Sequence, residues 1–234
     1  MKRRKAMARD KFGKNQRLSR PAWDERYRSR EMAWDMGQAA PPLVRISKHL
    51  NILGKSVLVP GCGRGFEAQL FARRDADVTA VDFSQLALTE ASKLAGARLG
   101  FEARRIEWVP SDVRRLPVSW TQRFDFVVEH TCFCALAPKD RETYLLEIHR
   151  VLKPSGRLVG LFFVDFNEPD GPPFGISQHE LRRLLENYFQ VVYWESHPPD
   201  SAEGRKNIEA LVIGNKINTV TPSLLSAPPL GDRG

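Results

Sequence analysis

The sequence is poor in cysteine and contains no long apolar run. Its three cysteines, Cys62, Cys132 and Cys134, are odd in number and are not spaced like a disulfide framework or the ligands of a zinc site. No metal is therefore expected, and the thiols indicate a reducing, cytoplasmic setting. No apolar run reaches the length of a membrane span, and the N-terminus lacks the apolar core of a secretory signal, so we expect no membrane partner.

Acidic residues are nearly missing from the first twenty positions. Residues 1–20 hold nine Lys or Arg and one acid, Asp10, so their net charge of +8 equals that of the whole 234-residue chain. The remainder is neutral. We interpret residues 1–20 as a basic disordered tail, residues 21–216 as one domain, and residues 217–234 as a second disordered tail. The basic tail could instead contact RNA or an anionic surface.

The most informative stretch is a short apolar strand, residues 56–59, followed by the alternating glycines Gly61, Gly63 and Gly65. A strand that turns sharply through glycines into a helix is typical of nucleotide-binding α/β units, because glycine permits the turn and lets a ligand approach the backbone. Alone, the pattern is also compatible with a simple turn. It differs from the dinucleotide motif, since Phe66 stands where the third glycine of Gly-x-Gly-x-x-Gly would be.

Two acids follow at the ends of the next two expected strands. Asp82 ends the β-branched run 77–81 and lies 21 residues after Gly61, where such folds hold a ribose diol. Alternatively, Asp82 could cap the following helix, a position that Ser84 also suits. Asp112 and Val113 follow the strand 106–109 and suit an adenine ring, although Asp112 could be an ordinary loop residue. Together these elements resemble the class I S-adenosylmethionine-dependent methyltransferases.

An aromatic cluster precedes the glycine turn. Trp23 and Tyr27 are four residues apart and share a face of an expected helix, and Trp34 follows in a loop. The rings could simply attach this helix to the domain. They could also form a lid over a sulfonium, because aromatic faces attract cations.

These segments, in this order, resemble the thiopurine S-methyltransferase family, and most closely its thiol and halide methyltransferase branch. The resemblance covers Trp23 to about Gly214 and includes residues 124–135 with Arg141 and Tyr144. It implies a Rossmann-like α/β three-layer sandwich with a seven-stranded, mostly parallel sheet, and S-adenosyl-L-methionine as cofactor. The implied and inferred cofactor-binding residues are Trp23, Tyr27, Trp34, Gly61, Gly63, Asp82, Asp112, Val113 and His130. Tyr27 and His130 depart from the branch, which often has Trp and Tyr at these positions.

The acceptor side is less defined by the sequence. His130 is the candidate for a general base, because imidazole titrates near neutrality, although it could equally be a structural histidine or a cofactor contact. Arg141 could face an anionic acceptor or the cofactor carboxylate, or could be a surface charge. The loop 165–174 could form a wall of the acceptor pocket or a rigid connector. Cys132 and Cys134 are interpreted as buried packing residues.

We therefore predict a monomeric methyltransferase that acts on a small soft nucleophile: a thiol, hydrosulfide, thiopurine or halide. A thiol needs no dedicated base, because part of it ionises near neutral pH. Two alternatives remain open: an RNA or protein N-methyltransferase that uses the basic tail, and a module that binds S-adenosylmethionine without catalysis. A nucleic-acid partner is not expected, because the folded part of the chain is neutral.

Overall fold

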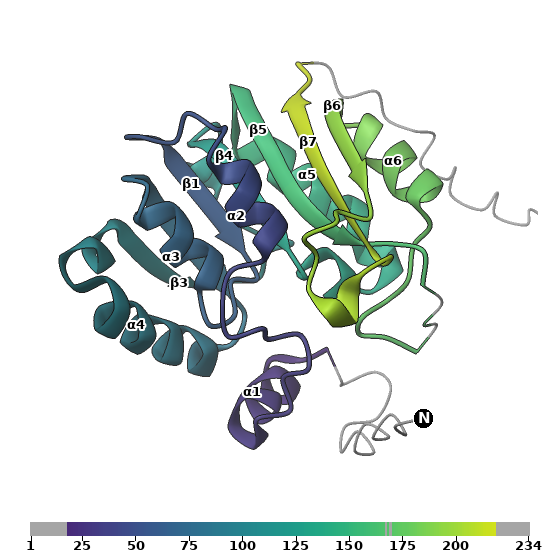
Figure 1. Ribbon diagram of the computed structural model, residues 1–234. Coiled ribbons are helices and arrows are strands. Elements are labelled where there is room, and N and C mark those ends of the chain that lie inside the picture. The colour runs from purple at the N-terminus through teal and green to yellow at the C-terminus, as the bar shows by residue number, and fades with distance from the viewer. Residues whose placement is uncertain (1–17, 167, 169, 219–234) are drawn as a thin grey trace, which may run out of the picture.

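A single mixed sheet organises the molecule (Figure 1). The computed structural model describes residues 18–166, 168 and 170–218. Within these residues, the sheet has seven strands in the order β3-β2-β1-β4-β5-β7-β6. The strands are β1 (Ser56–Pro60), β2 (Asp77–Asp82), β3 (Ile106–Pro110), β4 (Phe124–His130), β5 (Leu152–Phe163), β6 (Phe189–Ser196) and β7 (Glu209–Lys216).

The pairing of the strands confirms the expected sheet. Strands β1 to β5 pair in parallel, and β7 runs antiparallel to both of its neighbours, β5 and β6. The nearly all-apolar run 157–164 predicts the fifth strand, but β5 begins five residues before this run, because Leu152 already pairs with Phe124 at the amino end of β4. The predicted tails lie almost entirely outside the described residues, and the predicted domain limits stay a prediction.

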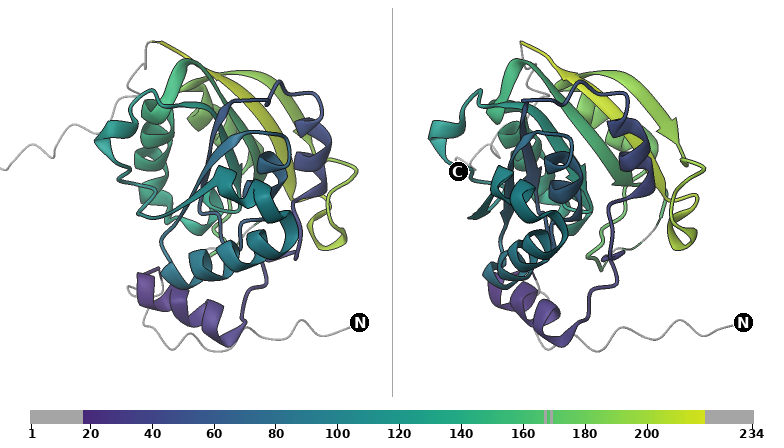
Figure 2. Two further views of the ribbon diagram at one scale, coloured as in Figure 1. Left: turned by 90° about the vertical axis from the view of Figure 1, so that its left-hand side faces the viewer. Right: turned by 60° about the vertical axis from the view of Figure 1, so that its left-hand side comes forward.

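Helices cover both faces of the sheet, which gives the three-layer arrangement seen in Figures 1 and 2. The helices are α1 (Arg20–Ser29), α2 (Pro41–Ser47), α3 (Phe66–Ala72), α4 (Gln85–Leu99), α5 (Arg141–Val151) and α6 (Gln178–Glu186). Short 3-10 turns connect them: η1 (Gly100–Arg105), η2 (Val118–Trp120), η3 (Phe133–Ala135), η4 (Pro138–Asp140) and η5 (Glu203–Arg205).

Two hydrophobic cores follow from the alternation of side chains along the strands. On β1, Val57 and Val59 face the core that contains α2, α3 and α4, whereas Leu58 faces the core that contains α5 and α6. All three side chains are almost completely buried. Apolar residues on both faces are what a parallel sheet with helices on each side requires.

The carboxyl ends of β1, β2, β3 and β4 lie at one edge of the sheet, which is the lower edge in Figure 1. The chain crosses this edge with α1 and the connection to α2, which lie below the sheet in the same view. Ligands of open α/β sheets bind outside the carboxyl ends of the strands. The fold therefore places the glycine turn, Asp82, the Asp112 loop and His130 at the edge where a ligand is expected.

Candidate functional site

The glycine turn after β1 requires glycine at all three positions. Gly61, Gly63 and Gly65 have φ angles of +58°, +51° and +75°, a region that other residues rarely adopt. A Cβ on Gly61 would lie 2.6 Å from Sγ of Cys132, and one on Gly65 would lie 2.5 Å from the Trp108 ring. The protein's own packing therefore demands glycine at positions 61 and 65, which is a stronger constraint than the approach of a ligand alone.

Asp82 lies directly beside this turn at the end of β2. Its Oδ2 accepts a hydrogen bond from the backbone N–H of Gly63 at 2.8 Å, and its Oδ1 accepts one from Ser84 N at 2.8 Å. Ser84, and not Asp82, is the N-cap of α4, because its Oγ accepts from Ala87 N. Each carboxylate oxygen of Asp82 thus keeps a lone pair that a ribose hydroxyl could use.

The Asp82 carboxylate is strongly desolvated. Its side chain lies almost entirely out of contact with solvent, and burial, with a smaller contribution from the nearby charge of Asp24, raises its pKa to about 6. The two backbone hydrogen bonds oppose this rise. An acid at this position therefore changes its charge close to neutral pH.

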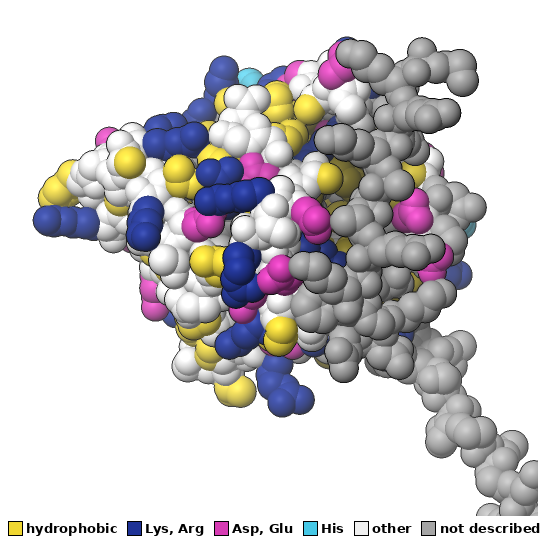
Figure 3. All heavy atoms as spheres, turned by 90° about the horizontal axis from the view of Figure 1, so that it is seen from below, with side chains coloured by type: hydrophobic (Ala, Val, Ile, Leu, Met, Phe, Trp, Pro, Cys, Tyr) yellow, Lys and Arg dark blue, Asp and Glu magenta, His cyan; other side chains and the backbone are white. Residues whose placement is uncertain are grey.

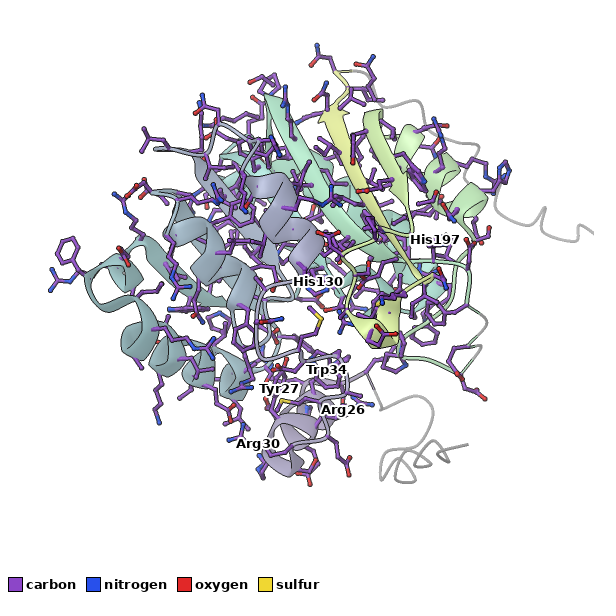
Figure 4. The ribbon with its side chains drawn as sticks, viewed as in Figure 1. Arg26, Tyr27, Arg30, Trp34, His130 and His197 are labelled. Atoms are coloured by element: carbon purple, nitrogen blue, oxygen red, sulfur yellow. The ribbon has the colours of Figure 1, made fainter. Side chains whose placement is uncertain are left out.

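The aromatic residues predicted as a lid meet above the glycine turn. The Trp34 ring packs edge-on against Trp23 and Tyr27, with centroid distances of 5.4 and 5.8 Å. Tyr27 is buried, and its hydroxyl lies 3.1 Å from where a Cβ of Gly63 would be. Figure 4 shows Tyr27 and Trp34 between α1 and the sheet edge. The same rings thus attach α1 to the domain and cover the turn, and their role as a lid over a sulfonium stays a prediction.

Ion pairs hold this lid against the glycine turn and α4. Arg64, inside the turn, lies 3.3 Å from Asp35 and 3.7 Å from Glu90, and Arg30 lies 2.7 Å from the same Glu90. On α1, the Asp24 carboxylate accepts a hydrogen bond from the Ser84 hydroxyl. Charged side chains from the lid therefore reach both the turn and the start of α4.

His130, at the end of β4, is bonded at both ring nitrogens. Nη1 of Arg205 donates to its Nε2 at 2.8 Å, which places the ring proton on Nδ1, and Nδ1 donates to Oε1 of Glu67 at 2.8 Å. Burial alone would raise the pKa of Glu67, but His130 and the N–H of Ala40 outweigh it and lower that pKa below its ordinary value. His130 is consequently hydrogen-bonded at both ring nitrogens in this structure, and its predicted role as a base stays a prediction.

Asp112 follows β3. The ends of β3 and β2 are linked by a hydrogen bond of 3.1 Å from the N–H of Ser111 to the carbonyl oxygen of Asp82. The Asp112 carboxylate accepts from Arg114 at 2.7 Å and from Arg114 N at 2.9 Å, which lowers its pKa against the effect of burial. Val113 is buried in the core shared with α5 and α6. Asp112 thus lies in the predicted region but is already paired with a cation.

Arg141, the first residue of α5, is buried and is not the surface charge considered above. Its guanidinium donates to the carbonyl oxygens of Phe174 and Gly175 at 2.8 and 3.1 Å and lies 4.8 Å from the centre of the Phe133 ring. Burial lowers its pKa, and its Nε has no hydrogen-bond partner. Arg141 therefore fixes the loop predicted to form a wall of the acceptor pocket.

The structure thus brings together Gly61, Gly63, Asp82, Trp23, Tyr27 and Trp34, while His130 joins a neighbouring cluster and Arg141 lies under the loop after β5. Cys132 and Cys134 are buried, as predicted, and Cys62 is buried as well. Glu67 and Arg205 were missed by sequence reasoning. Glu67 comes just after the glycine turn, and this position is a signal from which its place near the site could have been predicted. Arg205 lies 75 residues after His130 in a connection that contains no motif, so the sequence gives no such signal for it.

Two open cavities flank the site. A cavity of about 420 Å³ is lined by residues of the loop after β5, among them Asp165 and Phe174, and one of about 530 Å³ lies between α1 and α4, lined by Asp24 and Tyr27. Seen from this edge, basic and acidic side chains are interspersed on the surface that the grey residues leave visible (Figure 3). In the described part of the chain, no group of acidic, Cys and His side chains could hold a metal, and no helix could cross a membrane.

Comparisons with known proteins extend these observations. The family model described as "Thiopurine S-methyltransferase (TPMT)" matches residues 18–217. The chain is 28% identical to thiocyanate methyltransferase 1 of Arabidopsis thaliana, over 84% of this chain and 85% of the plant protein. It is 24% identical to the thiopurine S-methyltransferase of Vibrio parahaemolyticus, over 71% and 81% of the two chains.

Solved structures are similar as well. The 1,6-didemethyltoxoflavin-N1-methyltransferase of Burkholderia thailandensis, determined with 1,6-didemethyltoxoflavin and S-adenosylhomocysteine, superimposes with a TM-score of 0.69. The two sequences are 25% identical, and the match covers 85% of this chain and 87% of that chain.

Proposed function

The chain belongs to the thiopurine S-methyltransferase family, and from this premise we propose that it transfers the methyl group of S-adenosyl-L-methionine to a small soft nucleophile. The acceptor class we propose is a thiol, hydrosulfide, thiopurine or halide ion. The thiocyanate and thiopurine methyltransferases among its relatives support this class. The observation that carries the proposal is the buried Asp82 carboxylate between the glycine turn and the aromatic lid.

The residues at this edge fit the proposed cofactor. Asp82 would hold the ribose hydroxyls with its two remaining lone pairs, and the turn at Gly61 and Gly63 would face the amino-acid part of the cofactor. The rings of Tyr27 and Trp34 would cover the sulfonium, because aromatic faces attract cations most strongly where water is excluded. When bound, the cofactor supplies an electrophilic methyl group, and these residues orient it and keep water away.

The acceptor side is proposed to lie between His130 and the loop held by Arg141. Both ring nitrogens of His130 are hydrogen-bonded, so this residue presents no free ring nitrogen to an acceptor. A thiol near its ordinary pKa of about 8.5 supplies some thiolate without help, and a halide carries no proton at all. Catalysis would then depend on positioning, and Arg141 would contribute by fixing the carbonyls of Phe174 and Gly175.

A headspace assay tests this proposal. The purified protein is incubated with methyl-labelled cofactor and, separately, with hydrosulfide, a small organic thiol, iodide, thiocyanate and a thiopurine. We expect a labelled methyl product from at least one of these acceptors. Tight cofactor binding with no transfer to any of them would overturn the proposal in favour of a binding module.

The N-methyltransferase alternative needs a separate measurement. A variant that lacks residues 1–20 should keep its small-acceptor activity if the basic tail is dispensable. If the full-length protein labels RNA or protein and transfers no methyl group to any of the small acceptors, this result would instead support the alternative.

A further inference from the structure

The lid, which we define as residues 20–40, is held to the domain mainly by side chains. Helix α1 ends at Ser29, and α2 begins at Pro41, so residues 30–40 belong to neither helix nor strand. Two anchors hold this stretch. The first is the ion-pair group of Arg64 with Asp35 and Glu90 described above. The second anchor is formed by residues that the proposed chemistry does not use.

Arg205 is the centre of the second anchor. Its Nη2 donates to the backbone carbonyl of Trp34, in the middle of the lid, while its Nη1 donates to Nε2 of His130. The guanidinium is largely buried and lies 5.0 Å from the centre of the Phe163 ring. One side chain from the connection between β6 and β7 thus bridges the lid and the end of β4.

The same cluster holds the end of the lid. Oε1 of Glu67 accepts from the N–H of Ala40 at 3.1 Å and from Nδ1 of His130 at 2.8 Å. Ala40 is the N-cap residue of α2 and has no capping side chain of its own. The chain of contacts from Arg205 through His130 to Glu67 therefore fixes the lid at both Trp34 and Ala40.

The hydrogen bond between Arg205 and His130 has one possible direction. Arginine has only donors, so Nη1 of Arg205 donates to a lone pair on Nε2 of His130.

We propose that Arg205 is a positioning residue that latches the lid over the glycine turn. The charged groups around His130 are Glu67 on α3, Glu129 on β4, Arg205 in η5 and Glu209 on β7. Glu209 lies 3.5 Å from Arg205 and belongs to β7, so it holds the guanidinium to the sheet and not to the lid. The contacts of Arg205 do not depend on the proposed function. Only the purpose of the latch, which is to open and close the cofactor site, rests on that function.

Two substitutions of Arg205 test the latch. Arg205→Gln removes the charge and most of the donors, so it should lose the latch, and Arg205→Lys, which keeps the charge, should restore part of it. Arg182→Gln, which breaks an exposed ion pair with Glu186 on α6, controls for the loss of a charge.

Hydrogen exchange measured by mass spectrometry on the ligand-free protein tests the latch without any cofactor. At pH 7.5, peptides from residues 30–40 should exchange about tenfold faster in Arg205→Gln than in the wild type or in Arg182→Gln, after correction for intrinsic rates. In Arg205→Lys, their exchange rate should lie between those of the wild type and Arg205→Gln. Peptides from β1 and β4 report whether each variant is folded.

Two results would overturn the latch. One is equal protection of residues 30–40 in the wild type and in a folded Arg205→Gln variant. The other is equal protection in a folded Arg205→Met variant, which keeps the packing against Phe163 and decides the matter if Arg205→Gln does not fold. Neither result bears on methyl transfer, which the headspace assay measures independently.

Discussion

At the scale of single residues, burial determines when the key acids carry charge. Asp82 has a pKa of about 6, and Glu129 has one of about 7, in both cases chiefly because their side chains are removed from water. Both accept two backbone hydrogen bonds that partly offset this cost. Each acid therefore supports a prediction that links pH to a measurable property.

Asp82→Ala should weaken the binding of S-adenosylhomocysteine by about 2 kcal/mol, which is roughly a 30-fold rise in Kd, because charge-assisted hydrogen bonds are lost. The affinity should also fall about tenfold from pH 7 to pH 5 as Asp82 takes up a proton. Asp82→Asn should show no such fall. Isothermal titration calorimetry measures all three, and an unchanged Kd in a folded Asp82→Ala variant would refute the role of Asp82.

Glu129→Gln should stabilise the protein at alkaline pH. The folded state binds the Glu129 proton more tightly than the unfolded state, so ionisation destabilises the fold above pH 7, and this cost disappears towards pH 4.5. Glutamine can still accept from the N–H groups of Cys132 and Phe133. Urea denaturation should show a gain of about 2 kcal/mol at pH 8.5 and a much smaller gain at pH 5. An equal effect at both pH values would contradict the assigned cause.

The sequence located Asp82 because its position after a strand and a glycine turn is a local pattern. It did not reveal that Arg205 would bond His130, since the two residues meet only through the pairing of β7 with β5 and the return of the chain to the sheet edge. Asp112 and Arg114 are close in sequence, so their pairing is local. Whether the Asp112 carboxylate faces the cofactor site or Arg114 depends on the direction of its side chain, which the sequence does not give.

At the scale of elements, the glycine turn shows how closely β1 and β4 are packed at their ends. Gly61→Ala combines a left-handed backbone with a contact of 2.6 Å to Cys132, so we expect a loss of about 3 kcal/mol in the free energy of unfolding. Gly54→Ala has a similar φ of +67° but no atom within 4 Å, so it should cost about 1 kcal/mol from backbone strain alone.

Gly96→Ala completes this series. Gly96 lies inside α4 with ordinary helical backbone and open space around it, so alanine should stabilise the protein by about 0.5 to 1 kcal/mol. Chemical denaturation of the three variants separates strain, steric contact and helix propensity. Equal losses for Gly61→Ala and Gly54→Ala would show that the contact with Cys132 is unimportant.

Most elements followed from the sequence because their signals are local. Apolar runs predict the buried strands. The sequence also predicts helices over 139–152, before Pro154 and Gly156, and over 177–187, and these correspond to α5 and α6 within two residues at each end. The arrangement of the lid was harder to predict from the sequence. Spacing placed Trp23 and Tyr27 on one face, but the edge-on contact of both rings with Trp34 depends on how residues 30–40 fold back.

At the scale of the whole molecule, the surface supports the predicted monomer. The large hydrophobic side chains that are exposed in the described part of the chain are Leu53, Phe101, Val118, Leu146 and Val192, and they lie on separate elements. Stable dimers usually bury a contiguous apolar patch. Light scattering coupled to gel filtration should give the chain mass of 26.6 kDa, and twice that mass would contradict the prediction.

The three-layer fold could be predicted because the order of strands and helices and the glycine turn are properties of the sequence itself. The acceptor could not, because soft nucleophiles of different size differ only in the pocket shape they need. That shape depends on the loop which Arg141 holds and on the position of the lid.

A crystal structure of the protein with S-adenosylhomocysteine is the most direct test of the proposed cofactor site. The ribose hydroxyls should lie within hydrogen-bond distance of the Asp82 carboxylate, and the sulfur should lie between the glycine turn and the rings of Tyr27 and Trp34. Density for the ligand at another edge of the sheet, or a ribose without contact to Asp82, would contradict the site on which the proposed methyl transfer depends.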